Sequence, residues 1–307
     1  MTISTVGFVG MGKMGSRMAP HIASAGFPVH VFDLKDEAAE AVARAHNGIV
    51  VEKSAKAVAA ASDAVVTMLP AGPDVRLSAL GADGLAEGFG DGGVVIDMSS
   101  SQPWMTVELA EALSARGIAM IEAPVSGGID GAEAGTLTLM VGGDPEVVER
   151  CRPVLEPMAG NIYYAGASGS GHALKTLNNM LSGLNTMAAT EAMLIGTRFG
   201  LDPDTMVDVI SKSTGMNGAI VRTMKQQVIS RKFGGGFAWD LKFKDFKIAM
   251  ELAHRTNTSV PLSALAFELN QAANIWMGDT TGKTSAEIVR WMEAMAGSEI
   301  AKGDDTD

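Results

Sequence analysis

The feature that most constrains this chain is a glycine-rich segment close to its start. Residues 6–19 read VGFVGMGKMGSRMA, and Gly10, Gly12 and Gly15 stand where an apolar run typical of a strand passes into a helical stretch. The run PVHVF follows as a second strand and ends at Asp33. This order predicts one βαβ unit of about 30 residues with an acid about 20 residues beyond the glycines, which is the pattern of a dinucleotide-binding turn.

Each glycine has a separate physical reason in such a unit. Gly10 permits the tight turn, Gly12 lets a pyrophosphate approach the backbone, and Gly15 lets the helix pack closely on the strand. The helix N-terminus adds unpaired N–H groups and a positive dipole. We therefore expect cofactor contacts from Gly10, Met11, Gly12, Met14 and Gly15; a tight turn that binds no ligand is the alternative.

The acid at the end of the second strand indicates which dinucleotide is bound. Asp33 can accept hydrogen bonds from both ribose hydroxyls, and its charge would repel a 2′-phosphate. Leu34 and Lys35 follow, so no arginine stands there to hold such a phosphate. The sequence predicts NAD over NADP; a solvated turn residue is the alternative role for Asp33.

The first half of the chain alternates β-branched runs, such as DAVVTMLP and GGVVIDMS, with alanine-rich helical stretches. This alternation predicts an α/β fold with a doubly wound, mainly parallel sheet. After residue 171 leucines recur at helical intervals instead. We expect a Rossmann domain over 1–165, a boundary in the glycine- and serine-rich segment 163–171, an all-α substrate and oligomerisation domain over 166–300 entered by a long helix, and a disordered tail over 301–307.

Composition excludes several classes of function. The 35 acidic and 24 basic residues give a net charge of −11, so the chain should repel nucleic acid and anionic membrane surfaces. No apolar run reaches the ~20 residues that cross a bilayer, and no leader pattern opens the sequence. The single cysteine, Cys151, fits a reducing compartment, and we expect a soluble, cytoplasmic protein.

Two helical stretches of the second half, 181–200 and 260–278, carry apolar residues around most of their circumference. Helices of this kind are usually buried on several sides. We therefore expect a homodimer or a homotetramer.

Several segments together resemble the β-hydroxyacid dehydrogenase family, which includes 3-hydroxyisobutyrate dehydrogenase and tartronate semialdehyde reductase. The resemblance extends from residue 3 to about 295 and rests on GFVGMGKMGSRMA, TMLP, DMSS, EAPVSGGIDGAEAGTLTLMVGG, GSGHALKTLNN and GFAWDLKFKD. DMSS and the last segment look most like 2-(hydroxymethyl)glutarate dehydrogenase. The resemblance implies NAD-dependent hydride transfer between a small 3-hydroxy acid and its semialdehyde, without a metal, and favours a homotetramer.

The resemblance assigns substrate roles by position. Ser126, Gly127 and Gly128 follow a strand, where their N–H groups and hydroxyl would hold a substrate carboxylate. Lys175 would exchange the hydroxyl proton, and Asn179, at i+4 on the same helix face, would hold the reacting groups. A lysine with the ordinary pKa of ~10.4 is a poor base at neutral pH, so the site must lower that pKa by burial. Without the family, an ordinary turn and a surface lysine are the simpler interpretations.

Further cofactor contacts follow from the same resemblance. Leu69 and Pro70 in TMLP, and Ser100 in DMSS, stand at strand ends beside the dinucleotide, and Lys244 in KFKD would reach the cofactor from the second domain. Asp74 stands where the family often has asparagine.

Residues beside these motifs receive lesser roles. Gly171 would leave room beside the substrate. His172 could mimic a catalytic histidine, but it has no acidic partner beside it, so we expect a cap or surface residue. Trp239 and Phe237 are expected to serve in packing.

Three other functions compete with this one. An imine reductase shares the architecture but usually has aspartate or tyrosine where Lys175 stands, and a decarboxylating sugar-phosphate dehydrogenase needs a basic cluster beyond Arg222 and Lys225. A catalytically silent NAD-binding protein is the third. Among substrates, 3-hydroxyisobutyrate, tartronate semialdehyde, 2-(hydroxymethyl)glutarate and 4-hydroxybutyrate stay open.

Overall fold

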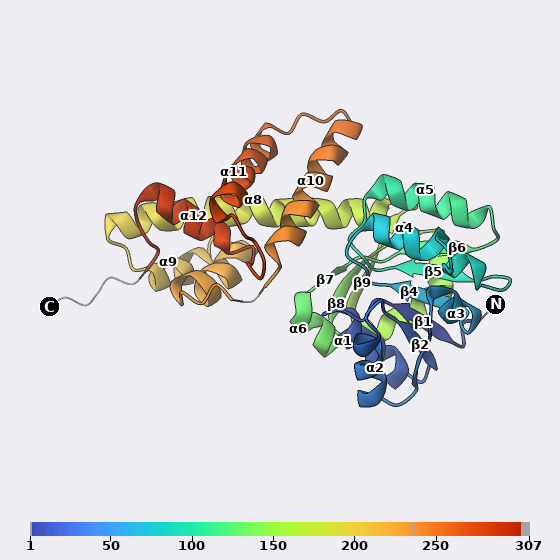
Figure 1. Cartoon of the computed structure of the whole chain (residues 1–307). Helices are drawn as coiled ribbons and strands as arrows, with labels where there is room; N and C mark the ends of the chain where they lie inside the picture. Colours follow the sequence, from blue (N-terminus) through green and yellow to red (C-terminus); the bar gives the residue numbers. More distant parts are fainter. Residues whose placement is uncertain (1, 235, 302–307) are drawn as a thin grey trace. The chain divides into compact units, whose positions relative to one another are not determined.

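The computed structural model describes residues 2–234 and 236–301 (Figure 1). It divides into two compact units, Met1–Lys175 and Thr176–Asp307. The domain limits expected from the sequence, 165 and 166, lie shortly before this division. The expected disordered tail at 301–307 falls outside the described residues, apart from Ala301.

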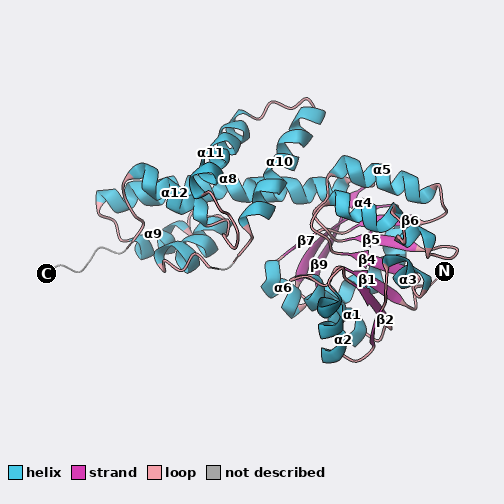
Figure 2. Cartoon of the chain, viewed as in Figure 1, coloured by secondary structure: helices cyan, strands magenta, loops and turns pink. Residues whose placement is uncertain are grey.

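A nine-stranded sheet forms the centre of the first unit (Figure 2). Its strands run in the order β3-β2-β1-β4-β5-β6-β8-β7, and β9 pairs with β8. The neighbours from β3 to β6 are parallel, whereas β8 is antiparallel to β6 and β7. The strands are β1 (Val6–Val9), β2 (Val29–Phe32), β3 (Ile49–Val51), β4 (Ala64–Thr67), β5 (Val94–Asp97), β6 (Ala119–Glu122), β7 (Val125–Ser126), β8 (Leu137–Gly143) and β9 (Ala159–Gly166).

Helices cover both faces of this sheet (Figures 1 and 2), as a doubly wound fold requires. Neighbouring residues of β1 show the two-sided burial: Phe8 joins the core beneath α1, α2 and α7, and Val9 joins the core beneath α3, α4 and α5. The helices of this unit are α1 (Gly15–Ser24), α2 (Asp36–Ala45), α3 (Ala55–Ala60), α4 (Gly72–Leu80), α5 (Pro103–Ser114), α6 (Gly128–Ala134) and α7 (Pro145–Leu155).

The chain reverses its direction across the sheet beside β1. It passes outward through β2 and β3 and then returns to β4 on the other side of β1. In open α/β sheets this switch point, at the carboxyl ends of the strands, is where ligands bind. The expected doubly wound fold is therefore confirmed, and it places the glycine-rich turn at the switch point.

Strand β9 occupies part of the segment that the sequence marks as a boundary loop. It pairs in parallel with β8, yet Tyr163 and Tyr164 are 58% and 52% exposed. An edge strand with exposed side chains lacks the apolar run that identifies a buried strand. Backbone pairing to β8 therefore forms a strand that side-chain pattern alone does not reveal.

The second unit is helical, as expected, and its described residues hold only an isolated bridge, Ala238 to Thr284, in place of strands. Its core includes Met193, Met224, Trp239 and Phe246. The long helix predicted from the leucine spacing is α8, and the division between the units falls within it. The elements are α8 (Ser170–Phe199), α9 (Pro203–Ile210), a π-helical segment (Ala219–Ile229), α10 (Trp239–Arg255), α11 (Pro261–Met277) and α12 (Glu287–Ala296).

No helix within residues 2–234 and 236–301 is long and apolar enough to cross a membrane. Cys151 is fully buried in the first unit, where burial raises the pKa of its thiol to about 12. This thiol therefore serves in packing rather than as a nucleophile. The cytoplasmic compartment stays a prediction.

Candidate active site

The glycine-rich turn after β1 has the geometry that its three glycines require. Gly10 has a φ of +101°, and its N–H donates to the Phe32 carbonyl oxygen at 2.9 Å. A Cβ on Gly15 would collide with the carbonyl oxygen of Gly10, whereas a Cβ on Gly12 would meet no heavy atom within 4 Å. Gly10 thus makes the turn, Gly15 lets helix α1 pack, and the open space at Gly12 fits an approaching pyrophosphate.

Asp33, at the end of β2, is held beside this turn. Its Oδ2 accepts the Met11 N–H at 2.7 Å, and its Oδ1 accepts the Lys35 N–H at 2.8 Å. Each carboxylate oxygen retains a further lone pair for a ribose hydroxyl. The residues present therefore fit the adenosine half of a dinucleotide.

The loops after β4 and β5 are tied together at the same edge of the sheet. The Leu69 N–H donates to the Ser99 hydroxyl at 2.9 Å. Pro70 and Ser100 are the next residues of the two loops; Pro70 is exposed and Ser100 is half-buried. The structure thus brings Leu69, Pro70 and Ser100 to the carboxyl ends of adjacent strands, as the sequence predicts for cofactor contacts.

The predicted carboxylate loop leaves the short strand β7. Gly127 and Gly128 have φ values of +139° and +68°, conformations that a side chain would strain. Beside Gly128 an added Cβ would meet no heavy atom within 4 Å, and no side chain caps helix α6, which begins there. The backbone N–H groups after Ser126 are thus accessible to a ligand anion.

Lys175 lies beside this loop. The lysine is 9% exposed, and its Nζ donates to the Val125 carbonyl oxygen at 2.7 Å. Val125 directly precedes Ser126, and both residues lie in the first unit together with Lys175. This unit therefore holds the predicted proton-exchange group, Lys175, beside the loop that is predicted to bind the substrate carboxylate. This burial excludes the alternative of a solvated surface lysine.

Asn179 follows one turn later on α8, and its contacts belong to the second unit. Its Nδ2 donates to Oδ2 of Asp245 at 2.5 Å, and Lys244 Nζ lies 3.5 Å from Oδ1 of the same carboxylate. Asp245 is 1% exposed. Sequence analysis missed Asp245, although it stands next to Lys244 in the KFKD segment, and the contact of Lys244 with a cofactor stays a prediction.

The expectation for His172 was wrong: the residue is fully buried in the first turn of α8. Its Nδ1 is 2.8 Å from the Thr106 hydroxyl, and its Nε2 is 3.1 Å from the Ser99 carbonyl oxygen and 3.7 Å from Oδ2 of Asp97. The acidic partner is distant in sequence and reaches the histidine because β5 ends beneath α8. His172 therefore anchors the start of α8 to the sheet.

A second buried acid, Glu122, supports the same helix end. It is the register partner of Asp97 across β5 and β6, and its Oε1 accepts the Gly171 N–H at 3.0 Å. Among the described residues, its Oε2 has no hydrogen-bond partner, and burial raises the pKa of Glu122 to about 7. A Cβ on Gly171 would collide with the Met140 carbonyl oxygen. Gly171 is therefore needed because the chain packs closely against Met140. The sequence analysis had expected this glycine to leave room beside the substrate.

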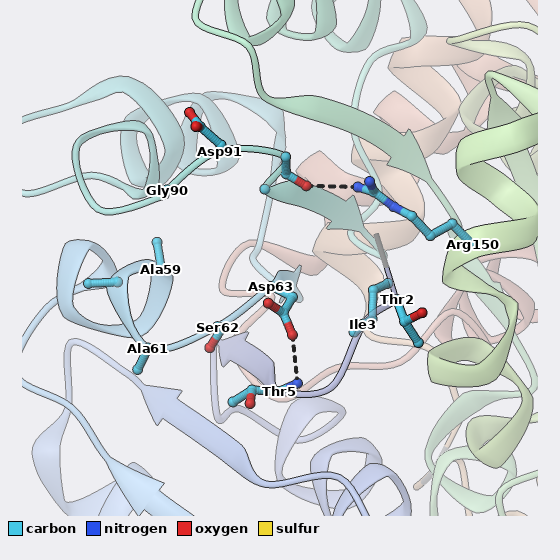
Figure 3. Close-up of a pocket in the computed structure, with 13 residues that line it drawn as sticks. Thr2, Ile3, Thr5, Ala59, Ala61, Ser62, Asp63, Gly90, Asp91 and Arg150 are labelled. Atoms are coloured by element: carbon cyan, nitrogen blue, oxygen red, sulfur yellow. Dashed lines mark hydrogen bonds between the residues drawn. The ribbon is translucent and has the colours of Figure 1, made fainter.

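The cavity in Figure 3 lies at the opposite edge of the sheet. Its lining residues Thr5, Asp63 and Gly92 precede strands β1, β4 and β5, whereas the candidate site follows the strands. Asp63 accepts the Thr5 N–H at 3.0 Å, and Arg150 donates to the Gly92 carbonyl oxygen at 2.9 Å. These pairs tie the amino ends of the strands together, so this cavity is not part of the candidate active site.

The chain matches two known families over almost its whole length. Residues 5–166 match the NAD binding domain of 6-phosphogluconate dehydrogenase, and residues 169–292 match the NAD-binding family of NADP-dependent 3-hydroxyisobutyrate dehydrogenase. Together with the glycine-rich turn and Asp33, these matches define an oxidoreductase that uses a nicotinamide dinucleotide.

Individual relatives make the assignment narrower. The chain is 39% identical to 2-(hydroxymethyl)glutarate dehydrogenase of Eubacterium barkeri over 97% of this chain and 98% of that protein. It is 37% identical to NAD-dependent L-serine dehydrogenase of Pseudomonas aeruginosa, over 86% and 90% of the two chains. The chain belongs to the β-hydroxyacid dehydrogenase family.

Solved structures agree with this membership. The structure of 3-hydroxyisobutyrate dehydrogenase from Mycobacterium tuberculosis with L-serine superimposes with a TM-score of 0.86 and 32% identity, over 95% of this chain and 99% of that one. An imine reductase from Myxococcus stipitatus reaches a TM-score of 0.62 at 16% identity over 95% and 100%, which shows a shared fold only.

Proposed function

We propose that this protein catalyses the NAD-dependent oxidation of a small 3-hydroxy acid to its semialdehyde, or the reverse reduction, with Lys175 as general acid and base. One observation carries the proposal: the Lys175 Nζ is 2.7 Å from the carbonyl oxygen of Val125, the residue that precedes the Ser126 to Gly128 loop. A substrate whose carboxylate bound to that loop would bring its hydroxyl within reach of Lys175.

The proposed step moves one hydride and one proton. When bound, the nicotinamide supplies the hydride acceptor. In the oxidation the neutral Lys175 amine takes the hydroxyl proton as the C–H bond breaks and the C=O bond forms, and in the reduction the Lys175 ammonium returns that proton. Asn179 is proposed to orient the reacting oxygen, with its amide fixed by Asp245.

We propose NAD as the preferred cofactor. The carboxylate of Asp33 is held by two backbone N–H groups, so it cannot readily turn away from a 2′-phosphate. Like charges at that position disfavour NADP. The names of the L-serine dehydrogenase and the NADP-dependent family show that both cofactors occur among relatives.

The test is a set of initial rates followed at 340 nm. The purified protein is assayed with 3-hydroxyisobutyrate, 2-(hydroxymethyl)glutarate, 4-hydroxybutyrate and L-serine, and with tartronate semialdehyde for the reverse reaction, each with NAD(H) and NADP(H). We expect turnover of at least one hydroxy acid or semialdehyde with NAD(H). Tight NADH binding with no turnover of any compound would favour a catalytically silent protein, and turnover of cyclic imines alone would favour an imine reductase.

We also propose a homodimer or homotetramer. Large apolar side chains are exposed on helices of the second unit, including Ile195 at 72% and Phe199 at 83% on α8 and Ile275 at 80% on α11. Contact with further copies of the chain would bury them.

A further inference from the structure

The helix that follows the predicted carboxylate loop buries little of its own surface. Helix α6 has seven residues and begins at Gly128, and its buried residues are Gly131 and Ala132. Its one large apolar side chain, Ile129, is 38% exposed. Burial of a single alanine contributes little to stability, because hydrophobic stabilisation scales with the apolar area that is removed from water. The position of α6, and of the Ser126 to Gly128 loop before it, therefore depends largely on polar contacts with other elements.

His21 of α1 supplies such contacts, since α1 lies beside α6 (Figures 1 and 2). Its Nε2 is 2.9 Å from the Ala132 carbonyl oxygen and 3.1 Å from the Glu133 carbonyl oxygen. Both partners are acceptors, so Nε2 carries a hydrogen and donates to them. Gly135, which ends α6 with a φ of +64°, makes room for the ring, because an added Cβ would lie 3.2 Å from His21 Cε1. His21 thus gives a donor to two of the last carbonyl groups of α6, which lack partners within a helix.

Arg17 makes a second link between the same two helices. It precedes His21 by four residues, so both side chains lie on one face of α1. Its Nη1 donates to the Lys13 carbonyl oxygen of the dinucleotide turn at 2.8 Å, and its Nε lies 2.8 Å from the Glu133 carboxylate. The Arg17 and Glu133 side chains are 36% and 70% exposed, so this ion pair contributes less than the His21 contacts. The helix that begins at the dinucleotide turn thus also holds the far end of α6.

We propose that His21 is a positioning residue for the substrate: it holds α6 so that the Ser126 to Gly128 loop stands at a fixed place beside the dinucleotide turn. This inference rests on the proposed function, in which that loop binds the substrate carboxylate. Without the His21 hydrogen bonds the loop occupies displaced positions, and the apparent affinity for substrate falls with the fraction of molecules whose loop is correctly placed. Bound substrate selects the correct position, so the hydride transfer itself changes little. His21 lies in the last turn of α1, at the opposite end from the dinucleotide turn, so its effect is confined to the substrate.

The first test compares His21→Leu, which removes the donor, with His21→Gln, whose Nε2 donates at a similar reach. We expect His21→Leu to raise the KM for the best hydroxy acid about 3- to 10-fold, and to leave kcat and the KM for NAD within about twofold. His21→Gln should return the KM to within about twofold of the wild type, because it restores the donor. His46→Leu, at an exposed histidine that follows α2, is the matched control. An unchanged KM, an equal rise in the KM for NAD, or a Gln variant as impaired as the Leu variant would overturn the inference.

A binding measurement separates this inference from the proposed function. Isobutyrate and 2-methylglutarate have the carboxylates of two candidate substrates but no hydroxyl to oxidise, so their binding to the NADH complex, followed by NADH fluorescence, reports on the loop without turnover. We expect His21→Leu to bind the tighter of the two about 3- to 10-fold more weakly than the wild type does, with NADH affinity unchanged.

Two results of this measurement would overturn the positioning role, whether or not turnover is observed: equal binding of the carboxylate by the wild type and the Leu variant, or no binding of either carboxylate by the wild type. If binding is weaker in the variant but no hydroxy acid is oxidised by the wild type, the proposed reaction fails and the positioning role of His21 stands.

Discussion

At the scale of single residues, Asp33 determines which dinucleotide the turn accepts. Replacement by Asn keeps the size and an acceptor for the Met11 N–H but removes the negative charge. We expect the NAD-to-NADP ratio of kcat/KM to fall about 10- to 100-fold, since repulsion between unit charges ~4 Å apart ranges from ~1 to ~4 kcal/mol with the local dielectric. Asp36→Asn, an exposed acid on α2, is the control. An unchanged ratio in Asp33→Asn would show that another residue selects the cofactor.

The burial of Lys242 leads to a prediction about the stability of the fold, which can be measured without a substrate. Its pKa is lowered from 10.5 to about 8, so burial of the ammonium destabilises the fold fully below pH 8 and progressively less toward pH 10.5. We expect Lys242→Met to increase the free energy of unfolding at pH 7 by on the order of 3 kcal/mol, and by less at pH 9.5. Urea titrations of both proteins measure this. A Met variant less stable than the wild type at pH 7 would contradict it.

At the scale of elements, the start of α8 determines where Lys175 stands. Gly171 donates to Glu122, and His172 contacts Thr106 and the Ser99 carbonyl. These contacts tie the first turn of the helix to the ends of β5 and β6. Because Lys175 follows one turn later, this anchoring fixes its reach to Val125.

Glu122 gives this anchor a dependence on pH. Its pKa is raised from 4.5 to about 7, so the fold favours the protonated carboxyl and loses stability as the pH rises through this interval. Asp97, its register partner, raises the pKa further, and His172 lies beside Asp97. We expect the stability of Glu122→Gln relative to wild type to increase between pH 5 and pH 8, by up to ~3 kcal/mol. Thermal midpoints across this range check the prediction, with the exposed Glu108→Gln as the control; a difference that stays constant or shrinks would be inconsistent with it.

The predictability of these elements from sequence depends on burial. Strands β1, β4 and β5 are buried along their whole length, so they read as apolar runs, and the turn after β1 is recognisable because its glycines have fixed spacing. The edge strand β9 has exposed tyrosines and shows no such run. The partners of His172 and Asn179 are distant in sequence, and the burial of Glu122 and Lys242 depends on packing. These contacts can therefore be identified only in the folded structure and not in the sequence.

At the scale of the whole molecule, the exposed apolar side chains of the second unit predict an assembly. We expect light scattering at micromolar concentration to give the mass of a dimer or tetramer. Replacement of Ile195, 72% exposed on α8, by Glu should shift the population toward smaller species, because a charge buried at an interface is unfavourable. A wild type that scatters as a monomer would rule out the assembly.

The most direct test of the account is the rate of Lys175→Ala on the best substrate of the wild type. General acid and base groups contribute about 10²- to 10⁴-fold, so we expect kcat to fall by that factor while NADH binding, followed by fluorescence, stays close to normal. The surface variant Lys53→Ala should retain full activity. A Lys175→Ala enzyme with a near-normal kcat would contradict the proton-transfer role on which the proposed function rests.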